Sequence, residues 1–415
     1  MIKSSQLTLE KIILGLVLLL ANLRALVFIF LFPDTSVLLG TAWIEILLWA
    51  LAGGGVLYLL RREGQLDEFL AMWRRNWPLV LFVLLAFISL FWSMGPVATL
   101  FRSLELSFAT LIAAYFGMRL NPQRMMEALF WFGAVLLILS VALVYSAPPT
   151  GTMYWAPFNG AWRGIFWHRN HLGSLTALLS IVYLIRVSLA FRDRNSKGVM
   201  DAVFYAISLV VLVFTRSATG YILFFVLHGS LLIVWLWLQI SHRLTRVHYL
   251  SILGVGGLAV VLTLANLDLV FGLFGRDASM TGRTGLWSNL IDIAGRRPWL
   301  GHGFGAFWTF DANREEIRRL VGWTSQPLIG DNGLLDIYLH LGLVGVILFV
   351  SVLVLVTVRA FRYAVEQKTL AGFFPLLVMV YAFFANITFS LFAETEVFIW
   401  FLIVVVLFMT TRISR

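Results

Sequence analysis

Apolar stretches of about 20 residues recur along the whole chain, and they restrict the possible folds more than any other feature. A helix of that length crosses the hydrocarbon core of a bilayer. Lipid offers no hydrogen-bond partner to backbone N–H or C=O groups, so such segments must be helical. Only 13% of the 415 residues are charged, about half the share of a soluble domain. We therefore predict an all-α polytopic membrane protein, with a single transmembrane domain over residues 1–415.

We expect about twelve transmembrane helices, because each apolar run is long enough to span a bilayer. Their expected ranges are 11–32, 37–60, 77–92, 99–117, 128–146, 171–189, 202–214, 220–240, 250–271, 333–356, 371–389 and 397–410. Residues 266–332 are the only long polar interval, and they are rich in Arg, Asp and Glu. We therefore expect a long loop between the ninth and tenth helices that carries much of the functional site.

Lys and Arg gather in every second connection between the expected helices, for example at residues 61–76 and 186–197. Connections rich in these residues stay on the cytoplasmic side of a membrane. This pattern predicts that both termini are cytoplasmic and that residues 266–332 lie on the outer side. It also accounts for the net charge of +10 without a nucleic-acid partner. The chain has no cysteine, which excludes disulfides, thiolate metal sites and cysteine nucleophiles.

The outer side should be poor in basic residues, yet several of its segments hold arginine and none holds lysine. Arg163 and Arg169 lie in residues 147–170, Arg216 lies in the tight turn 215–219, and further arginines lie in the long loop. The planar guanidinium binds phosphate at two points, whereas Lys is a point charge. Each arginine alone can equally extend to the lipid headgroups. As a set on the disfavoured side, they favour an anionic ligand.

Short polar motifs mark the ends of several expected helices, at residues 162–173, 215–220, 282–287, 296–305 and 330–336. Asn170 fits the N-cap of the helix that follows it, which is an alternative to a role in binding. His168 and His171 have no third ligand nearby, so we expect no metal site. The glycines of residues 282–305 lack the strand–turn–helix context of a nucleotide-binding loop.

Taken in order, these motifs resemble the O-antigen ligase and polymerase superfamily of bacterial envelope glycosyltransferases, and most of all its exopolysaccharide-production branch. The matching residues are Gly164, Phe166, Asn170, Leu172 and Gly173; Arg216 and Ser217; Gly282, Arg283 and Trp287; Pro298, Gly301, Gly303, Gly305 and Phe307; and the pattern over residues 332–345. The resemblance covers roughly residues 162–350 in the same order as in the family.

The resemblance implies a GT-C-like fold in the bacterial inner membrane with a periplasmic active site. It implies transfer of a glycan from an undecaprenyl-diphosphate carrier to an acceptor sugar hydroxyl, with inversion. The lipid diphosphate that leaves needs cations, and the attacking hydroxyl needs a base. The outer side has no Asp-x-Asp metal pattern, so we expect arginine to neutralise the diphosphate without a metal or cofactor. A flippase and a chain-length regulator are possible partners, and no nucleic acid is expected.

The site residues follow from the same comparison. We expect Asp331, Arg283 and Arg216 to be catalytic, and Arg163, Arg169, Asn170, Arg296 and Asn332 to bind the diphosphate or the substrate. The family usually has His immediately before the Asn that opens the tenth helix, and here that position is Asp331. Asp331 either replaces this His as base or orienting group, or serves only as the helix N-cap.

Other functions remain open at the level of sequence. A polymerase, which uses another lipid-linked repeat as acceptor, is favoured over a ligase that transfers to a lipid A core. A transporter or channel is the rival class. It would place charges within the spans and show repeat symmetry, and the sequence shows little of either.

Overall fold

The structure is a computed structural model, and it describes residues 2–22, 38–154, 158–194, 196, 198–240, 283–322, 330–388 and 397–411. Helices make up most of this part of the chain. They are α1 (Ile2–Leu20), α3 (Leu38–Arg62), α4 (Leu66–Arg75), α5 (Trp77–Ile88), η2 (Ser89–Phe91), α6 (Pro96–Arg119), α7 (Pro122–Ser146), α8 (Pro148–Gly151), α9 (Arg169–Arg192), α10 (Gly198–Thr215), α11 (Ala218–Ile240), α14 (Arg283–Ala294), η4 (Phe307–Thr309), α15 (Asp311–Val321), α16 (Gly333–Gln367), η5 (Ala371–Phe373), α17 (Phe374–Thr388) and α18 (Val397–Thr411). The all-helical prediction is confirmed for the described residues.

Seven of the described helices are long and apolar enough to cross a membrane, or up to eight if the bent pair α4 and α5 forms one span. The seven correspond to the spans expected at 37–60, 99–117, 128–146, 171–189, 202–214, 220–240 and 333–356. The spans expected at 371–389 and 397–410 are shorter apolar helices. The span expected at 250–271 and part of that at 11–32 lie outside the described residues. A polytopic membrane protein is therefore confirmed, and the count of about twelve stays a prediction.

The connection expected at residues 61–76 contains a helix, α4, that the apolar pattern did not reveal. Phe69 and Met72 are buried on one face of α4, and the axis turns by 86° between α4 and α5. Asn76 stabilises this bend, because its Nδ2 donates to the Met72 carbonyl at 2.9 Å. An arginine of α16 adds a second bond across the bend, from Arg359 Nη2 to the Arg75 carbonyl at 3.1 Å.

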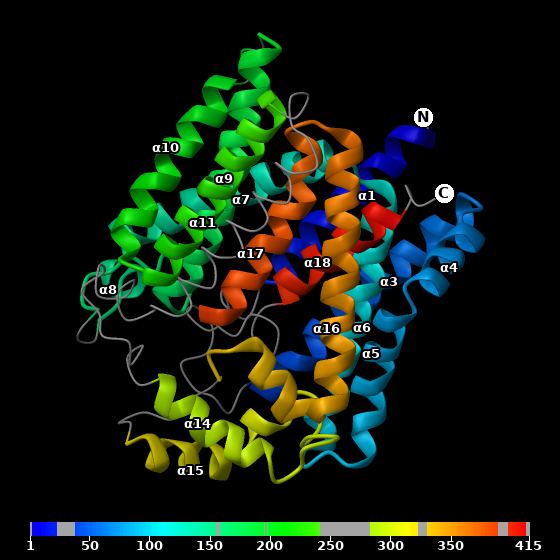
Figure 1. Cartoon of the computed structure of the whole chain (residues 1–415), viewed down its shortest axis with the longest axis vertical. Helices are drawn as coiled ribbons and strands as arrows, with labels where there is room; N and C mark the ends of the chain where they lie inside the picture. Colours follow the sequence, from blue (N-terminus) through cyan, green and yellow to red (C-terminus); the bar gives the residue numbers. More distant parts are fainter. Residues whose placement is uncertain are drawn as a thin grey trace.

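Helix α18 forms the centre of the bundle, packed against α6 and α16 (Figure 1). It is buried from Phe398 to Thr411, as expected of a helix that is apolar on all sides. Glycine permits the closest contact with α6, since a Cβ on Gly117 would lie 2.5 Å from the Val405 carbonyl oxygen. The bundle therefore depends on this glycine for the distance between its central helices.

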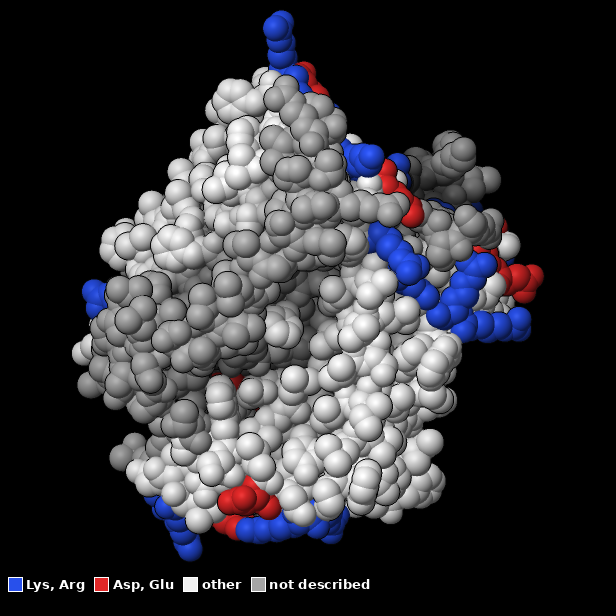
Figure 2. Space-filling model, viewed as in Figure 1, with Lys and Arg blue, Asp and Glu red and all other residues white. Residues whose placement is uncertain are grey.

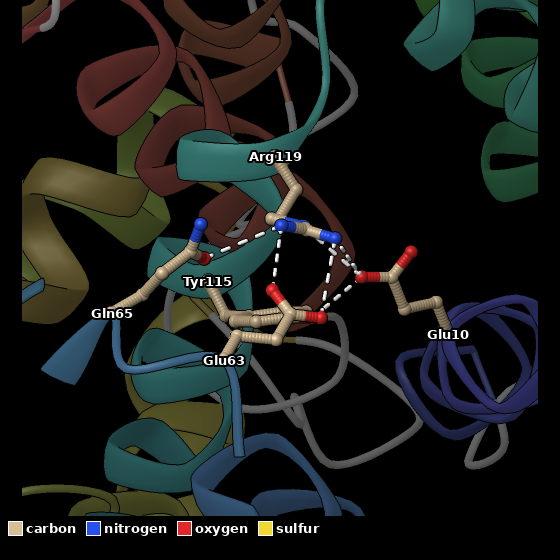
Figure 3. Close-up of polar contacts among 5 residues, drawn as sticks. All are labelled: Glu10, Glu63, Gln65, Tyr115 and Arg119. Carbon is tan, nitrogen blue, oxygen red and sulfur yellow. Dashed lines mark hydrogen bonds and ion pairs between the residues drawn. The ribbon is translucent and has the colours of Figure 1, made fainter. Parts of the chain in front are cut away.

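A polar cluster around Arg119, at the end of α6, joins α1, α3 and α6 (Figure 3). Arg119 donates to Glu10 at 3.0 Å, to Glu63 at 2.7 Å and to Gln65 at 3.3 Å. The Tyr115 hydroxyl also donates to Glu10, at 2.6 Å. The two carboxylates compensate the arginine, so the cluster fixes three helices at the end of the bundle where both termini lie.

Helices α14 and α15 lie at the opposite end of the molecule from the two termini (Figure 1). On the right of the view, Figure 2 shows a broad uncharged surface between the charged residues at these two ends. Uncharged helix surface between polar ends is what a lipid-facing surface requires. Which end faces the cytoplasm stays a prediction from the basic-residue pattern.

Candidate functional site

The connection before α9 is anchored on the end of α10 by Trp162. Its ring stacks on Phe214, with centroids 4.6 Å apart, and its backbone N–H donates to the Phe214 carbonyl at 2.9 Å. Thr152 and Trp162 also form an isolated antiparallel bridge. The motif 162–173 and the turn 215–220, distant in sequence, therefore lie together.

Glycine lets α9 and α11 approach closely at this point. A Cβ on Gly173 would lie 2.7 Å from the Cβ of Ser217, and a Cβ on Gly220 would lie 3.0 Å from the backbone of Gly173. A larger residue at either position would push the helices apart. The glycines of these motifs are therefore explained by packing.

The structure brings together four of the predicted site residues, Arg163, Arg169, Asn170 and Arg216, which we call the arginine cluster. Arg169 is buried, its guanidinium lies 3.9 Å from the centroid of the Phe158 ring, and its Nη1 donates to the Arg216 carbonyl. Arg169 thus fixes the turn that carries Arg216. The Arg216 side chain is exposed and donates to the Asn159 carbonyl at 3.4 Å.

Arg163 is held inside the connection before α9. Its Nε donates to the Thr150 carbonyl at 2.8 Å and its Nη1 to the Trp167 carbonyl at 3.3 Å. Burial lowers the pKa of the Arg163 guanidinium below its ordinary value, opposed by the nearby Tyr154. These bonds to carbonyls give Arg163 a clear role in shaping the connection.

The sequence offered Asn170 as the N-cap of α9, and the structure shows that this interpretation is wrong. The helix begins one residue earlier, and His168 is its N-cap, with Nδ1 accepting from the Asn170 N–H at 3.2 Å. The Asn170 side chain instead accepts from the Ser217 hydroxyl at 2.9 Å. Ser217 Oγ in turn accepts from the Gly220 N–H at 3.1 Å. Asn170 therefore connects α9 to the turn that carries Arg216.

The described part of the long polar loop contains α14 and α15. Arg283 begins α14, and its side chain lies outside the described residues. Arg296 forms an exposed ion pair with Glu316 of α15 at 2.8 Å, which connects the end of α14 to α15. Exposed pairs of this kind contribute little to stability.

The glycine-rich segment, residues 298–307, fills a break in α16. Gly342 has non-helical dihedral angles, φ 63° and ψ −164°, so backbone groups on both sides of it lose their helical partners. The segment replaces them: the His302 and Gly303 N–H groups donate to the Leu339 and His340 carbonyls, each at 2.9 Å, and Leu343 N–H donates to the Pro298 carbonyl at 2.8 Å. The break is thus compensated by hydrogen bonds, as buried backbone requires.

Close contact explains the glycines of this segment. A Cβ on Gly301 would lie 2.5 Å from the backbone of His340, and one on Gly303 would lie 2.3 Å from Ser93 Oγ. Gly301, Gly303 and Gly305 also have positive φ, which glycine adopts without strain. His302, between them, donates through Nδ1 to the Leu339 carbonyl at 3.0 Å. Burial lowers the pKa of His302 below its ordinary value.

Asp331 is not the N-cap of α16. Asn332 is the cap, because its Oδ1 accepts from the Leu334 and Leu335 N–H groups at 3.1 and 3.2 Å. Asp331 precedes it in a left-handed conformation with φ 51°. Such a conformation is uncommon for a residue other than glycine, although Asp and Asn tolerate it best. The N-cap role that the sequence left open for Asp331 is therefore wrong.

Sequence reasoning placed neither Asp336 nor Trp308 among the site residues. Both are buried, and Trp308 Nε1 donates to Asp336 Oδ1 at 2.8 Å. It also missed Arg102 of α6, which pairs with Glu105 at 3.3 Å beneath Gly305. An acidic residue three positions into an apolar helix was the available signal for Asp336.

The chain resembles known proteins over a region that includes Arg216 and the glycine-rich segment. Residues 203–350 match the model of the family described as O-Antigen ligase. The chain is also 26% identical over 290 residues to the exopolysaccharide production protein ExoQ of Rhizobium meliloti. That match covers 66% of this chain and 62% of the relative's length.

Fold and comparisons agree on the class, a polytopic membrane protein that is similar to the O-antigen ligase family. They confirm the resemblance to the O-antigen ligase and polymerase superfamily, including its exopolysaccharide-production members.

Proposed function

We propose that the protein is an inverting membrane glycosyltransferase. It moves a glycan from an undecaprenyl-diphosphate carrier to an acceptor sugar hydroxyl at the periplasmic face of the inner membrane. The arginine cluster, whose Arg216 lies within the family match, carries this proposal. A lipid diphosphate is the anionic ligand that such a cluster, at the end of apolar helices, suits best.

The observation with most weight is the conformation of Arg216. Its backbone is left-handed, with φ 49°, and buried Arg169 holds its carbonyl. Strained conformations of this kind persist only where the surroundings enforce them, and they gather at functional sites. Here the strain places an exposed guanidinium on a rigid turn, ready to bind a ligand.

The reaction follows from the residues proposed for the site. The acceptor hydroxyl oxygen attacks the anomeric carbon of the donor glycan, and the bond from that carbon to the diphosphate oxygen breaks. Asp331 orients the hydroxyl and takes its proton. Arg216 and Arg283 bind the diphosphate as it gains negative charge, and Arg163, Arg169, Asn170, Arg296 and Asn332 support them.

The acceptor distinguishes two versions of this function. We favour a polymerase, which adds the growing glycan to another lipid-linked repeat, because ExoQ is described as an exopolysaccharide production protein. The family description as O-Antigen ligase supports the alternative, transfer to a lipid A core.

Deletion of the gene tests the proposal through the lipid-linked glycans that accumulate. A polymerase deletion leaves single repeats on the carrier lipid, and the wild-type chain restores polymer. Long chains on the carrier would show that the protein is the ligase. An unchanged pool of lipid-linked glycans would refute both versions.

A further inference from the structure

We propose that Asp336 is a positioning residue, which fixes Asp331 by holding the backbone N–H of Gly330, the residue before it. The inference rests on the proposed function in taking Asp331 as the group that contacts the acceptor hydroxyl. Asp336 lies one helical turn inside α16 and is completely buried.

Gly330 is held from two sides by neighbouring elements. Its N–H lies 3.2 Å from Asp336 Oδ1 and 3.3 Å from Oδ2. Its carbonyl, which belongs to the peptide bond leading to Asp331, accepts from Trp287 Nε1 of α14 at 2.9 Å. Trp308 holds Asp336 itself, donating to Oδ1 at 2.8 Å. The start of the turn is therefore fixed by α14, α16 and η4 together.

The residue at position 330 must be small for this arrangement to form. A Cβ there would lie 2.8 Å from Asp336 Oδ1 and 3.2 Å from Leu290 Cδ1. On the other side of Asp331, Asn332 is fixed as the cap of α16. With both neighbours held, the backbone of Asp331 stays in the left-handed conformation that it would otherwise leave.

The same geometry argues against Asp336 as the base. A base must come within hydrogen-bond reach of the hydroxyl that it deprotonates. Asp336 has no exposed surface, and its oxygens face Trp308 and Gly330. It can therefore act on the reaction only through Asp331.

Two substitutions separate these roles in the purified full-length protein, assayed with a carrier-linked repeat. Asp336→Asn retains Oδ1, the oxygen that accepts from both Trp308 and Gly330, so most activity should remain. Asp336→Leu removes every acceptor, and kcat should fall about 10²-fold, the effect of misplacing a reacting group by about 1 Å, with little change in the KM for the donor. Asp193→Leu, at an exposed position just after the C-terminal end of α9, is the matched control. Equal loss in Asn and Leu would show that Asp336 is the base and overturn the inference.

A double-mutant cycle tests the connection to Asp331. In an Asp331→Asn background, Asp336→Leu should cause no further loss, because both changes remove the same contribution. If the fold-losses of the two single variants multiply in the double variant, Asp336 has a merely structural role. If Asp336→Leu does not fold, Trp308→Phe removes one bond to Asp336 and should lower kcat several-fold. Trp131→Phe, at an exposed position on α7, is the control. An unchanged kcat in Trp308→Phe would refute the inference.

A chemical probe keeps the test independent of transfer. The chain has no cysteine, so Asp331→Cys introduces a unique thiol. Its rate of reaction with a maleimide should change several-fold when Asp336→Leu is added and stay the same with Asp193→Leu. Lack of transfer by the wild type would refute the proposed function alone. An unchanged thiol rate would refute the positioning role alone.

Discussion

Replacing Asp331 by Asn should remove most transfer activity and leave the fold intact. Asn tolerates the left-handed conformation observed at φ 51° at least as well as Asp does. The cap of α16 is Asn332, so the substitution removes no capping bond. We therefore expect the free energy of unfolding to change by less than about 0.5 kcal/mol. Loss of a general base lowers kcat by about 10²–10⁴-fold, which corresponds to roughly 3–5 kcal/mol on the barrier.

A matched control is available in the neighbouring residue. The double variant Asp331→Asn with Asn332→Asp keeps the net charge and an oxygen that can cap α16, and moves the carboxylate by one residue, about 3.8 Å between Cα atoms. It should unfold at nearly the wild-type temperature and should not recover transfer. Asp331→His, which restores the residue usual in the family, should recover part of it.

The assay is extension of a carrier-linked repeat by purified protein, followed by separation of products by length. Thermal unfolding of the same samples reports the fold. Normal polymer from Asp331→Asn would refute the assignment of the base. Equal loss of activity and of thermal stability would refute the argument that Asn332 alone caps the helix.

Other predictions concern the helix break, the arginine cluster and the topology. Gly342→Ala should destabilise the protein by more than about 1 kcal/mol, because its Cβ would lie 2.3 Å from backbone at a φ of 63°. Gly54→Ala, with nothing within 4 Å of its Cβ, should not destabilise it. Thermal unfolding compares the two variants, and equal midpoints would contradict this prediction. Arg216→Lys should lose most transfer through loss of the planar fork while keeping stability, and wild-type rates would remove Arg216 from the site. Cysteine at exposed Arg319 should react with an impermeant maleimide from the periplasm and cysteine at Arg62 should not, and the reverse pattern would invert the topology.

Most of the bundle could be predicted from the sequence alone. An apolar run of about 20 residues is long enough to cross the bilayer, and in lipid only a helix satisfies its backbone hydrogen-bonding groups. The spans expected at 99–117 and 128–146 match α6 and α7 closely. The family resemblance also followed from the order of short motifs. Helix α4 was missed, because its few apolar residues, with Phe69 and Met72 buried on one face, are too short a run to stand out.

The sequence also grouped Arg163, Arg169, Asn170 and Arg216 as candidates, from their residue types on the side disfavoured for positive charge. It could not show that Arg169 is buried beneath Phe158 while Arg216 is exposed. That difference depends on how α9 packs against the α10–α11 turn, which local sequence does not encode.

Only the tertiary structure decided the roles of residues 298–345. An apolar run predicts a continuous helix, but α16 breaks at Gly342 because the glycine-rich segment supplies hydrogen bonds to the freed backbone groups. Asp and Asn are about equally favoured as N-caps, so propensity does not choose between adjacent Asp331 and Asn332. Their backbone dihedral angles make that choice. The sequence therefore determined which segments enter the membrane, because many apolar residues contribute together to that outcome. The position of each polar group in the candidate site depends on contacts between segments distant in the chain, and it emerges only when those segments pack.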